Sequence, residues 1–163
     1  GFSVTVVDLL QDQGQPVSST TVRRALAAGD VSRVAQMLGR NFELRGTVVR
    51  GLGRGRTLGF PTANLGVPSG MAIPQDGIYA TWAHQDDRRL MAATSIGNRP
   101  TFEEHERTVE AFIMDFEGDL YDREVRLEFV RRLRDEEKYD TVEALQEQVA
   151  RDVDQTRAIL RST

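Results

Sequence analysis

The sequence contains no cysteine and only two histidines among its 163 residues. Without cysteine, the chain cannot form disulfide bonds or thiolate metal sites. Its composition is compatible with a reducing cytoplasm. No apolar run approaches the roughly 18 residues that a membrane-spanning helix needs. The formal net charge of −4 leaves no basic footprint for DNA or RNA. We therefore expect a cytoplasmic protein without membrane or nucleic-acid partners.

Composition and length describe a globular enzyme domain with a short appendage. Hydrophobic residues make up 39% of the chain and charged residues 28%, which is typical of folded proteins. A glycine-containing break at Gly39-Arg40-Asn41 divides a helical segment from a strand-rich one. We predict two parts, residues 1–40 and residues 41–163, of which the second is long enough to bury its own core.

The periodicity of apolar residues indicates a mainly β fold. Alternating strands bounded by turn signals are predicted over residues 42–50, 77–84, 89–96, 108–116 and 124–132, with a weaker one over 4–10. Helices with capping residues are predicted over about 20–28, 31–38 and 141–160. Many short antiparallel strands with turn signals favour a small closed antiparallel β-barrel, here with a C-terminal helix.

Glycine and arginine crowd the stretch that precedes a Pro-Thr-Ala-Asn turn. Its residues are Gly51, Gly53, Arg54, Gly55 and Arg56, followed by Gly59-Phe60-Pro61-Thr62-Ala63-Asn64-Leu65. Closely spaced glycines let backbone N–H groups approach an anion, and arginines favour negative charge nearby. The hydroxyl of Thr62 and the carboxamide of Asn64 are hard oxygen donors of the kind that Mg²⁺ accepts beside substrate phosphates. The pattern indicates a nucleotide-phosphate site.

The spacing of these glycines differs from the common phosphate loops. No lysine follows them, as the sequence G-x-x-x-x-G-K-[ST] would require, and their order G-x-G-x-G-x-x-x-G is not the dinucleotide fingerprint G-x-G-x-x-G. Glycine content alone is equally compatible with a glycine-rich hairpin between two strands.

Four motifs, in order along the chain, resemble those of the riboflavin kinase family. The glycine-rich stretch with Gly-Phe-Pro-Thr-Ala-Asn is similar to the family's signature loop. The other three are Asn98–Phe102, similar to an N-x-P-T-F turn, Val109–Phe116, similar to a V-E-x-x-x-x-D-F strand, and Leu133–Tyr139, similar to an L-R-x-E-x-x-F/Y segment. They are spread over residues 51–139. The resemblance implies a small barrel with a C-terminal helix that phosphorylates riboflavin with ATP.

The first forty residues resemble a different module. Val17-Ser18-Ser19-Thr20-Thr21-Val22-Arg23 is similar to the motif that ends the FMN adenylyltransferase module of bacterial FAD synthetases, in which a riboflavin kinase module follows on the same chain. Nothing here resembles the H-x-G-H motif of the adenylyltransferase module. The resemblance implies that residues 1–40 are the end of that module, that the full-length parent also makes FAD, and that this fragment makes FMN alone.

Glu110 is the candidate catalytic residue. In a strand, alternate residues share a face, so Glu110 is predicted to lie with Phe112, Met114 and Phe116 on an apolar face that points into the core. Partial desolvation would make this carboxylate a better base. The alternative is a glutamate at the barrel rim, paired with an arginine. The position matches the glutamate that the resemblance implies as general base.

The resemblance also implies the rest of the site. ATP would donate its γ-phosphoryl group to the 5′-hydroxyl of riboflavin, giving FMN and ADP, with Mg²⁺ held by Thr62 and Asn64. The flavin would lie near the second and fourth motifs, and its candidate contacts are Asn98, Arg99, Arg134 and Glu136.

Two other functions stay open from the residues alone. A flavin-binding module without catalysis would lack the base or the oxygen donors, whereas Glu110, Thr62 and Asn64 are all present. A small barrel that binds a protein or a nucleic acid would explain the fold but not the Pro-Thr-Ala-Asn sequence. The oligomeric state is not predicted.

Overall fold

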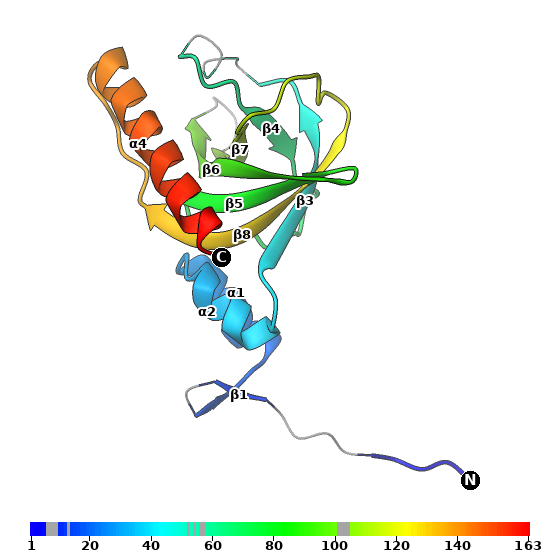
Figure 1. Cartoon of the computed structure of the whole chain (residues 1–163). Helices are drawn as coiled ribbons and strands as arrows, with labels where there is room; N and C mark the ends of the chain where they lie inside the picture. The colour runs from blue at the N-terminus through cyan, green and yellow to red at the C-terminus, as the bar shows by residue number, and fades with distance from the viewer. Residues whose placement is uncertain (6–9, 13, 52, 54, 56–57, 101–104) are drawn as a thin grey trace.

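The computed structural model describes residues 1–5, 10–12, 14–51, 53, 55, 58–100 and 105–163. A β-barrel forms its centre, one long helix lies along the outside of the barrel, two short helices pack at its lower end, and an extended N-terminal segment leads away from it (Figure 1). The strand predicted over residues 4–10 is not formed at residues 4, 5 and 10, and its other residues lie outside the described ranges.

The barrel is closed by six antiparallel strands in the order β3-β4-β7-β6-β5-β8. Their bounds are β3 Phe42–Val49, β4 Ala63–Gly66, β5 Gly77–Gln85, β6 Arg88–Pro100, β7 His105–Ile113 and β8 Glu124–Arg134. The predicted closed antiparallel barrel is therefore confirmed. A small separate hairpin pairs β1 (Gln11–Asp12) with β2 (Gln15–Pro16) near the N-terminus.

Local sequence signals set the ends of helices α1 (Ser19–Ala27), α2 (Val31–Leu38) and α4 (Val142–Arg161). The side chains of Ser18, Asp30 and Thr141 each accept a hydrogen bond from a backbone N–H in the first turn, as N-caps do. Gly39 ends α2 in the left-handed conformation, with φ of 67°. These caps explain why α1, α2 and α4 were predictable.

One hydrophobic core joins the barrel to the two short helices. The barrel contributes the inward side chains of its strands, and α1 and α2 contribute another group, so that the cluster includes Leu44, Tyr79, Ile96, Val109, Leu127, Phe129, Leu26, Val31, Val34 and Met37. Tyr79 and Phe129 pack edge to face within it, with 5.3 Å between ring centroids. Side chains of residues 19–38 therefore pack in the same core as the barrel. The division of the chain into two parts, residues 1–40 and residues 41–163, stays a prediction.

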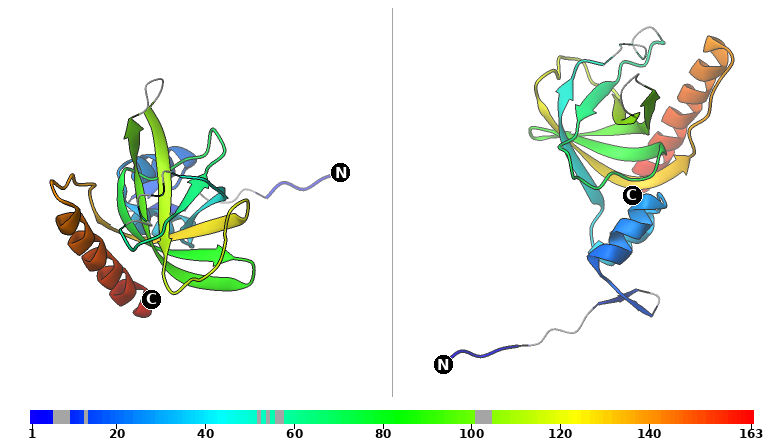
Figure 2. Two further views of the ribbon diagram at one scale, coloured as in Figure 1. Left: turned by 90° about the horizontal axis from the view of Figure 1, so that it is seen from above. Right: turned by 180° about the vertical axis from the view of Figure 1, so that it is seen from behind.

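Helix α4 packs against the outer face of β5, β6 and β8 (Figure 2). Its buried side chains include Val153 and Leu160 of the predicted apolar stripe, whereas Val142, at the start of the stripe, is exposed. Among the described residues, no helix combines the length and apolar character needed to cross a bilayer.

Two segments predicted as turns belong to strands. Asn64 lies in β4, where it pairs with Val49 on one side and Glu110 on the other. Asn98, Arg99 and Pro100 extend β6, whose residues 92–100 pair with β7. Proline and asparagine favour turns locally, but pairing with strands distant in the sequence overrides that preference here.

Candidate active site

Three polar residues are aligned across neighbouring strands. Asn64 on β4 and Ser95 on β6 are the two cross-strand partners of Glu110 on β7. Directly paired residues share a face of the sheet. All three are half-buried, while the next row, Leu65, Val109 and Ile96, is buried in the core. The polar row, Asn64–Glu110–Ser95, therefore lies on the outer face of the barrel.

The prediction that Glu110 shares a core-facing row is wrong. Among the β7 side chains that the structure describes, Val109, Ala111 and Ile113 are buried, so Glu110 and Phe112 face outward. Strand β7 ends at Ile113, and the chain then turns at Asp115, which has φ of 55°. Because the strand has ended, strand alternation no longer relates Met114 and Phe116 to Glu110.

Thr62 connects the polar row to the glycine-rich stretch. Its hydroxyl donates a hydrogen bond to Oε2 of Glu110 over 3.1 Å. A Cβ atom at Gly55 would lie 3.1 Å from Oγ1 of Thr62 and would collide with the carbonyl of Phe60. A Cβ atom at Gly51 would overlap the carboxamide of Asn64. These two glycines are therefore needed because the backbone passes directly against the two predicted oxygen donors.

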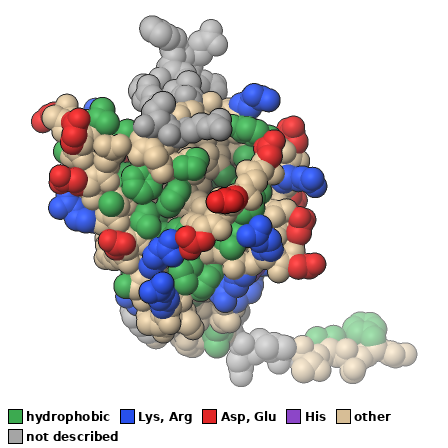
Figure 3. Space-filling view, turned by 45° about the horizontal axis from the view of Figure 1, so that its top comes forward, with side chains coloured by type: hydrophobic (Ala, Val, Ile, Leu, Met, Phe, Trp, Pro, Cys, Tyr) green, Lys and Arg blue, Asp and Glu red, His purple; other side chains and the backbone are tan. Residues whose placement is uncertain are grey.

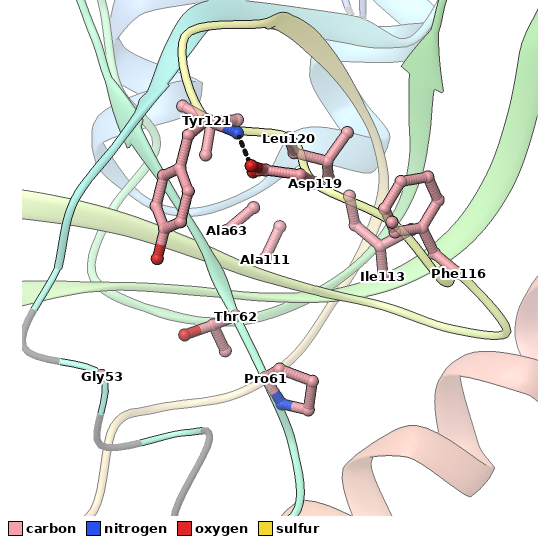
Figure 4. A pocket seen from close by; sticks show the side chains of 12 residues that line it. Gly53, Pro61, Thr62, Ala63, Ala111, Ile113, Phe116, Asp119, Leu120 and Tyr121 are labelled. Carbon is pink, nitrogen blue, oxygen red and sulfur yellow. Dashed lines mark hydrogen bonds between the residues drawn. The ribbon is translucent and has the colours of Figure 1, made fainter.

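An open pocket of about 660 Å³ lies beside Thr62 (Figure 4). One wall comes from inward side chains of the strands, including Val48, Ala63, Ala111 and Ile113. The loop after β7 supplies the opposite wall with Phe116, Asp119, Leu120 and Tyr121, and Gly53 of the glycine-rich stretch also lines the pocket. Glycine, apolar and aromatic groups thus surround a space that Thr62 also lines.

The sequence reasoning missed this loop as part of the site. Leu120 and Tyr121 are an apolar pair within an otherwise polar connection, and that contrast was the available signal. The loop holds its shape through Asp119, whose Oδ1 accepts a hydrogen bond from the backbone N–H of Tyr121 over 2.8 Å. On the face shown in Figure 3, hydrophobic side chains gather in the middle and charged side chains surround them.

Glu136 reaches the polar row from the segment after β8. Its Oε1 accepts a hydrogen bond from the Ser95 hydroxyl over 3.2 Å, and its carboxylate lies where a Cβ atom at Gly97 would be. Although Glu136 as a residue is exposed, partial desolvation of its carboxylate raises its pKa, and the negative charges of Asp76 and Glu110 raise it further. The structure thus brings two of the predicted site carboxylates, Glu110 and Glu136, to one region.

Replacing Glu136 with glutamine is expected to stabilise the fold at neutral pH. A carboxyl whose pKa is raised by folding contributes stability below its unfolded pKa, and this contribution is lost as the pH rises through the folded pKa. Glutamine carries no charge and can still accept the Ser95 hydrogen bond. The gain in melting temperature over the parent should therefore grow between about pH 4 and pH 8. A gain in melting temperature that does not change over this pH range would contradict a raised pKa of Glu136 in the folded protein.

Arg134 is held by helix α4. Its Nε and Nη2 donate to the two carboxylate oxygens of Asp152 over 2.9 and 2.7 Å, and this bond is the main reason why the pKa of Arg134 is raised. Gln148 donates to the same carboxylate over 3.0 Å. The Arg134 guanidinium also lies 6.0 Å from the centroid of the Tyr139 ring. Arg134 therefore joins β8 to α4, and its contact with flavin stays a prediction.

The structure says less about the remaining predicted site residues. Asn98 is exposed near the end of β6, and the side chain of Arg99 lies outside what the structure describes, as do Arg54 and Arg56. In the described part of the chain, no cluster of three or more histidine, cysteine, aspartate or glutamate side chains could hold a metal ion.

Comparisons with known proteins agree with this arrangement. A sequence model of the riboflavin kinase family, Flavokinase, matches residues 38–160. A bifunctional riboflavin kinase/FMN adenylyltransferase from Listeria monocytogenes is 36% identical over 158 residues, which are 96% of this chain and 50% of the relative. The chain therefore belongs to the riboflavin kinase family. It spans about half the length of the curated relatives it matches.

Two solved structures share the fold. A Streptococcus pneumoniae structure described as a macrolide-efflux protein has a TM-score of 0.87 and 36% identity, and covers 93% of this chain and 50% of its own. Riboflavin kinase from Trypanosoma brucei has a TM-score of 0.56 and 26% identity, with coverage of 73% and 79%. The family resemblance found in the four sequence motifs is confirmed.

Proposed function

We propose that this chain transfers the γ-phosphoryl group of ATP to the 5′-hydroxyl of riboflavin, giving FMN and ADP, with Glu110 as the general base. One observation carries the proposal: Thr62 lines the pocket, and its hydroxyl donates a hydrogen bond to Glu110 over 3.1 Å. Phosphoryl transfer depends mostly on positioning the two reactants and stabilising charge. Thr62 and Glu110 are placed where a nucleotide in the pocket would meet an acceptor on the outer face.

The pocket suits the nucleotide. Leu120, Tyr121 and Ile113 offer apolar and aromatic surface for a base, and Gly53 marks the side on which the glycine-rich stretch borders the pocket. Gly51 and Gly55 bring backbone close to Thr62 and Asn64, as a phosphate-binding loop requires. Positive charge from Arg54 and Arg56 completes the proposed phosphate site.

The outer polar row suits the acceptor. Ser95 and Glu136 lie beside Glu110 and offer hydrogen-bonding groups for the hydroxyls of a ribityl chain. We place the flavin ring farther along, towards Asn98, Arg99 and Arg134. The carboxylate of Glu110 then accepts the proton of the 5′-hydroxyl as that oxygen attacks phosphorus.

The donor set also fits a magnesium ion. Thr62 and Asn64 present a hydroxyl and a carboxamide oxygen on one face, and Gly51 leaves room for the carboxamide. Mg²⁺ binds such hard oxygens together with substrate phosphates and water, and does not need a cage of carboxylates. When bound, the ion would neutralise phosphate charge and orient ATP. Thr62 and Asn64 are the residues proposed to hold it.

The relatives suggest the wider setting. By analogy with the bifunctional proteins, we propose that residues 1–40 belong to an adenylyltransferase module and residues 41–163 to the kinase, within a cytoplasmic protein that also converts FMN to FAD. This chain by itself is proposed to stop at FMN because it carries no H-x-G-H motif.

Product analysis tests the proposed reaction. The chain is incubated with ATP, Mg²⁺ and riboflavin, and the flavins and nucleotides are separated by chromatography. We expect FMN and ADP in equal amounts and no FAD. 5′-Deoxyriboflavin, which lacks the acceptor hydroxyl, is the matched control and should yield neither product. ADP formation at the same rate with both flavins would show hydrolysis and contradict the proposal.

Thr62→Ala and Asn64→Ala are expected to weaken Mg²⁺-dependent ADP binding and turnover together, because each removes an oxygen donor. Thr62 precedes β4 and Asn64 is half-buried on the outer face, so both variants should fold. ADP binding is measured by calorimetry with and without Mg²⁺, beside thermal unfolding. A large fall in melting temperature with unchanged Mg²⁺ dependence would mean that the two residues are structural.

A further inference from the structure

A hydrogen bond joins helix α4 to the end of the glycine-rich stretch. Nε2 of Gln146 donates to the backbone carbonyl of Leu58 over 3.2 Å, although the two residues are 88 positions apart. Gln146 lies in the second turn of α4, seven residues before Val153, which is buried against the barrel. Residues seven apart share one face of a helix, so Gln146 points from the packed face of α4.

The bonded carbonyl belongs to a tight turn that leads directly to Thr62. The carbonyl of Gly55 accepts hydrogen bonds from the backbone N–H groups of Leu58 and Phe60 over 3.2 and 2.9 Å. The Phe60 ring packs edge to face on Phe112, with 5.3 Å between centroids. The turn is therefore fixed to β7 through Phe60 and to α4 through Leu58.

Two ion pairs hold helix α4, which carries Gln146, against the rest of the chain. Asp152 receives the two-pronged ion pair from Arg134 on β8. Near the other end of the helix, Arg157 donates to both carboxylate oxygens of Asp115 over 2.8 and 2.9 Å. Asp115 immediately precedes Phe116, which lines the pocket. The helix thus contacts both the glycine-rich stretch and the loop on the opposite side of the pocket.

We propose that Gln146 is a positioning residue for the nucleotide loop. By holding the Leu58 carbonyl, it fixes the backbone from Leu58 to Phe60, which bonds the Gly55 carbonyl, and so sets the position of the Thr62 hydroxyl relative to the pocket. The inference rests on the proposed placement of the nucleotide. It assigns to α4, which lies outside the four sequence motifs, a role in nucleotide affinity.

The test uses Gln146→Met, which keeps the length of the side chain and removes the N–H donor. Gln146→Ala serves the same purpose if the methionine variant does not fold. Glu147→Gln, at the neighbouring exposed position, is the matched control. For each, we measure the ADP dissociation constant with Mg²⁺, the riboflavin dissociation constant, the melting temperature, and amide hydrogen exchange at Leu58 and Phe60.

Loss of the donor should weaken ADP binding by roughly 3–10-fold, the effect of one ordinary hydrogen bond. Exchange at Leu58 and Phe60 should speed up, while riboflavin affinity stays within about twofold of the parent and Glu147→Gln changes neither. Parent-like ADP affinity and exchange in a folded variant would overturn the inference. So would an equal loss of ADP and riboflavin affinity, which would indicate general undocking of α4. Failure of the parent to form FMN would instead count against the proposed function.

Discussion

Replacing Glu110 with glutamine is expected to lower turnover by roughly 10²–10⁴-fold, the contribution typical of a positioned general base. Glutamine has nearly the same shape and its amide oxygen can accept the hydrogen bond from Thr62, so the strand and its neighbours should be preserved. What is lost is the ability to take up the proton of the attacking hydroxyl. Affinities for riboflavin and ADP should therefore change little, and kcat should carry the loss.

Glu43→Gln is the matched control for this variant. Glu43 lies on β3, where its carboxylate pairs with Arg126, and it takes no part in the proposed site. Its turnover should stay near that of the parent. If Glu110→Gln retains turnover within about threefold of the parent while both proteins are folded, Glu110 is not the base.

The second large effect is expected on stability, from Asp152→Ala. Asp152 is 4% exposed, and its carboxylate accepts three hydrogen bonds from Arg134 and Gln148. Its removal leaves the Arg134 guanidinium largely buried without its counter-charge. Removing one partner of a buried ion pair is strongly destabilising, and we expect a loss of about 3 kcal/mol in the free energy of unfolding.

Urea unfolding measures this loss, and the second ion pair of α4 provides the control. The Asp115 side chain is 72% exposed, so Asp115→Asn, which removes the charge and tolerates the positive φ at this position, should change stability far less than Asp152→Ala. Equal destabilisation by the two variants would show that burial does not decide the effect.

Local signals explain why most of the fold could be predicted. Helix α2 was predicted over residues 31–38, the bounds that it has, because Asp30 caps its start and Gly39 ends it. Five strands of the barrel followed from alternation of apolar residues. Strand β4 was missed because it is four residues long and follows Pro61, so that its pairing with β3 and β7 depends on segments far along the chain.

The site was predicted by its residue types and less well by its geometry. The motifs identified Thr62, Asn64 and Glu110, which the structure brings together. The face of Glu110 was assigned wrongly because the strand was predicted to run to Phe116, past the turn at Asp115. The pocket and the bond from α4 to the glycine-rich stretch depend on contacts between distant segments, which periodicity does not reveal.

The most direct test of the account is a crystal structure of this chain with ADP, Mg²⁺ and FMN. The account predicts the adenosine and phosphates in the pocket between Thr62 and Tyr121, and the FMN on the outer face. The oxygen that joins the ribityl chain to its phosphate should lie about 2.6–3.2 Å from the Glu110 carboxylate. FMN bound with that oxygen away from Glu110, or ADP bound outside the pocket, would contradict it.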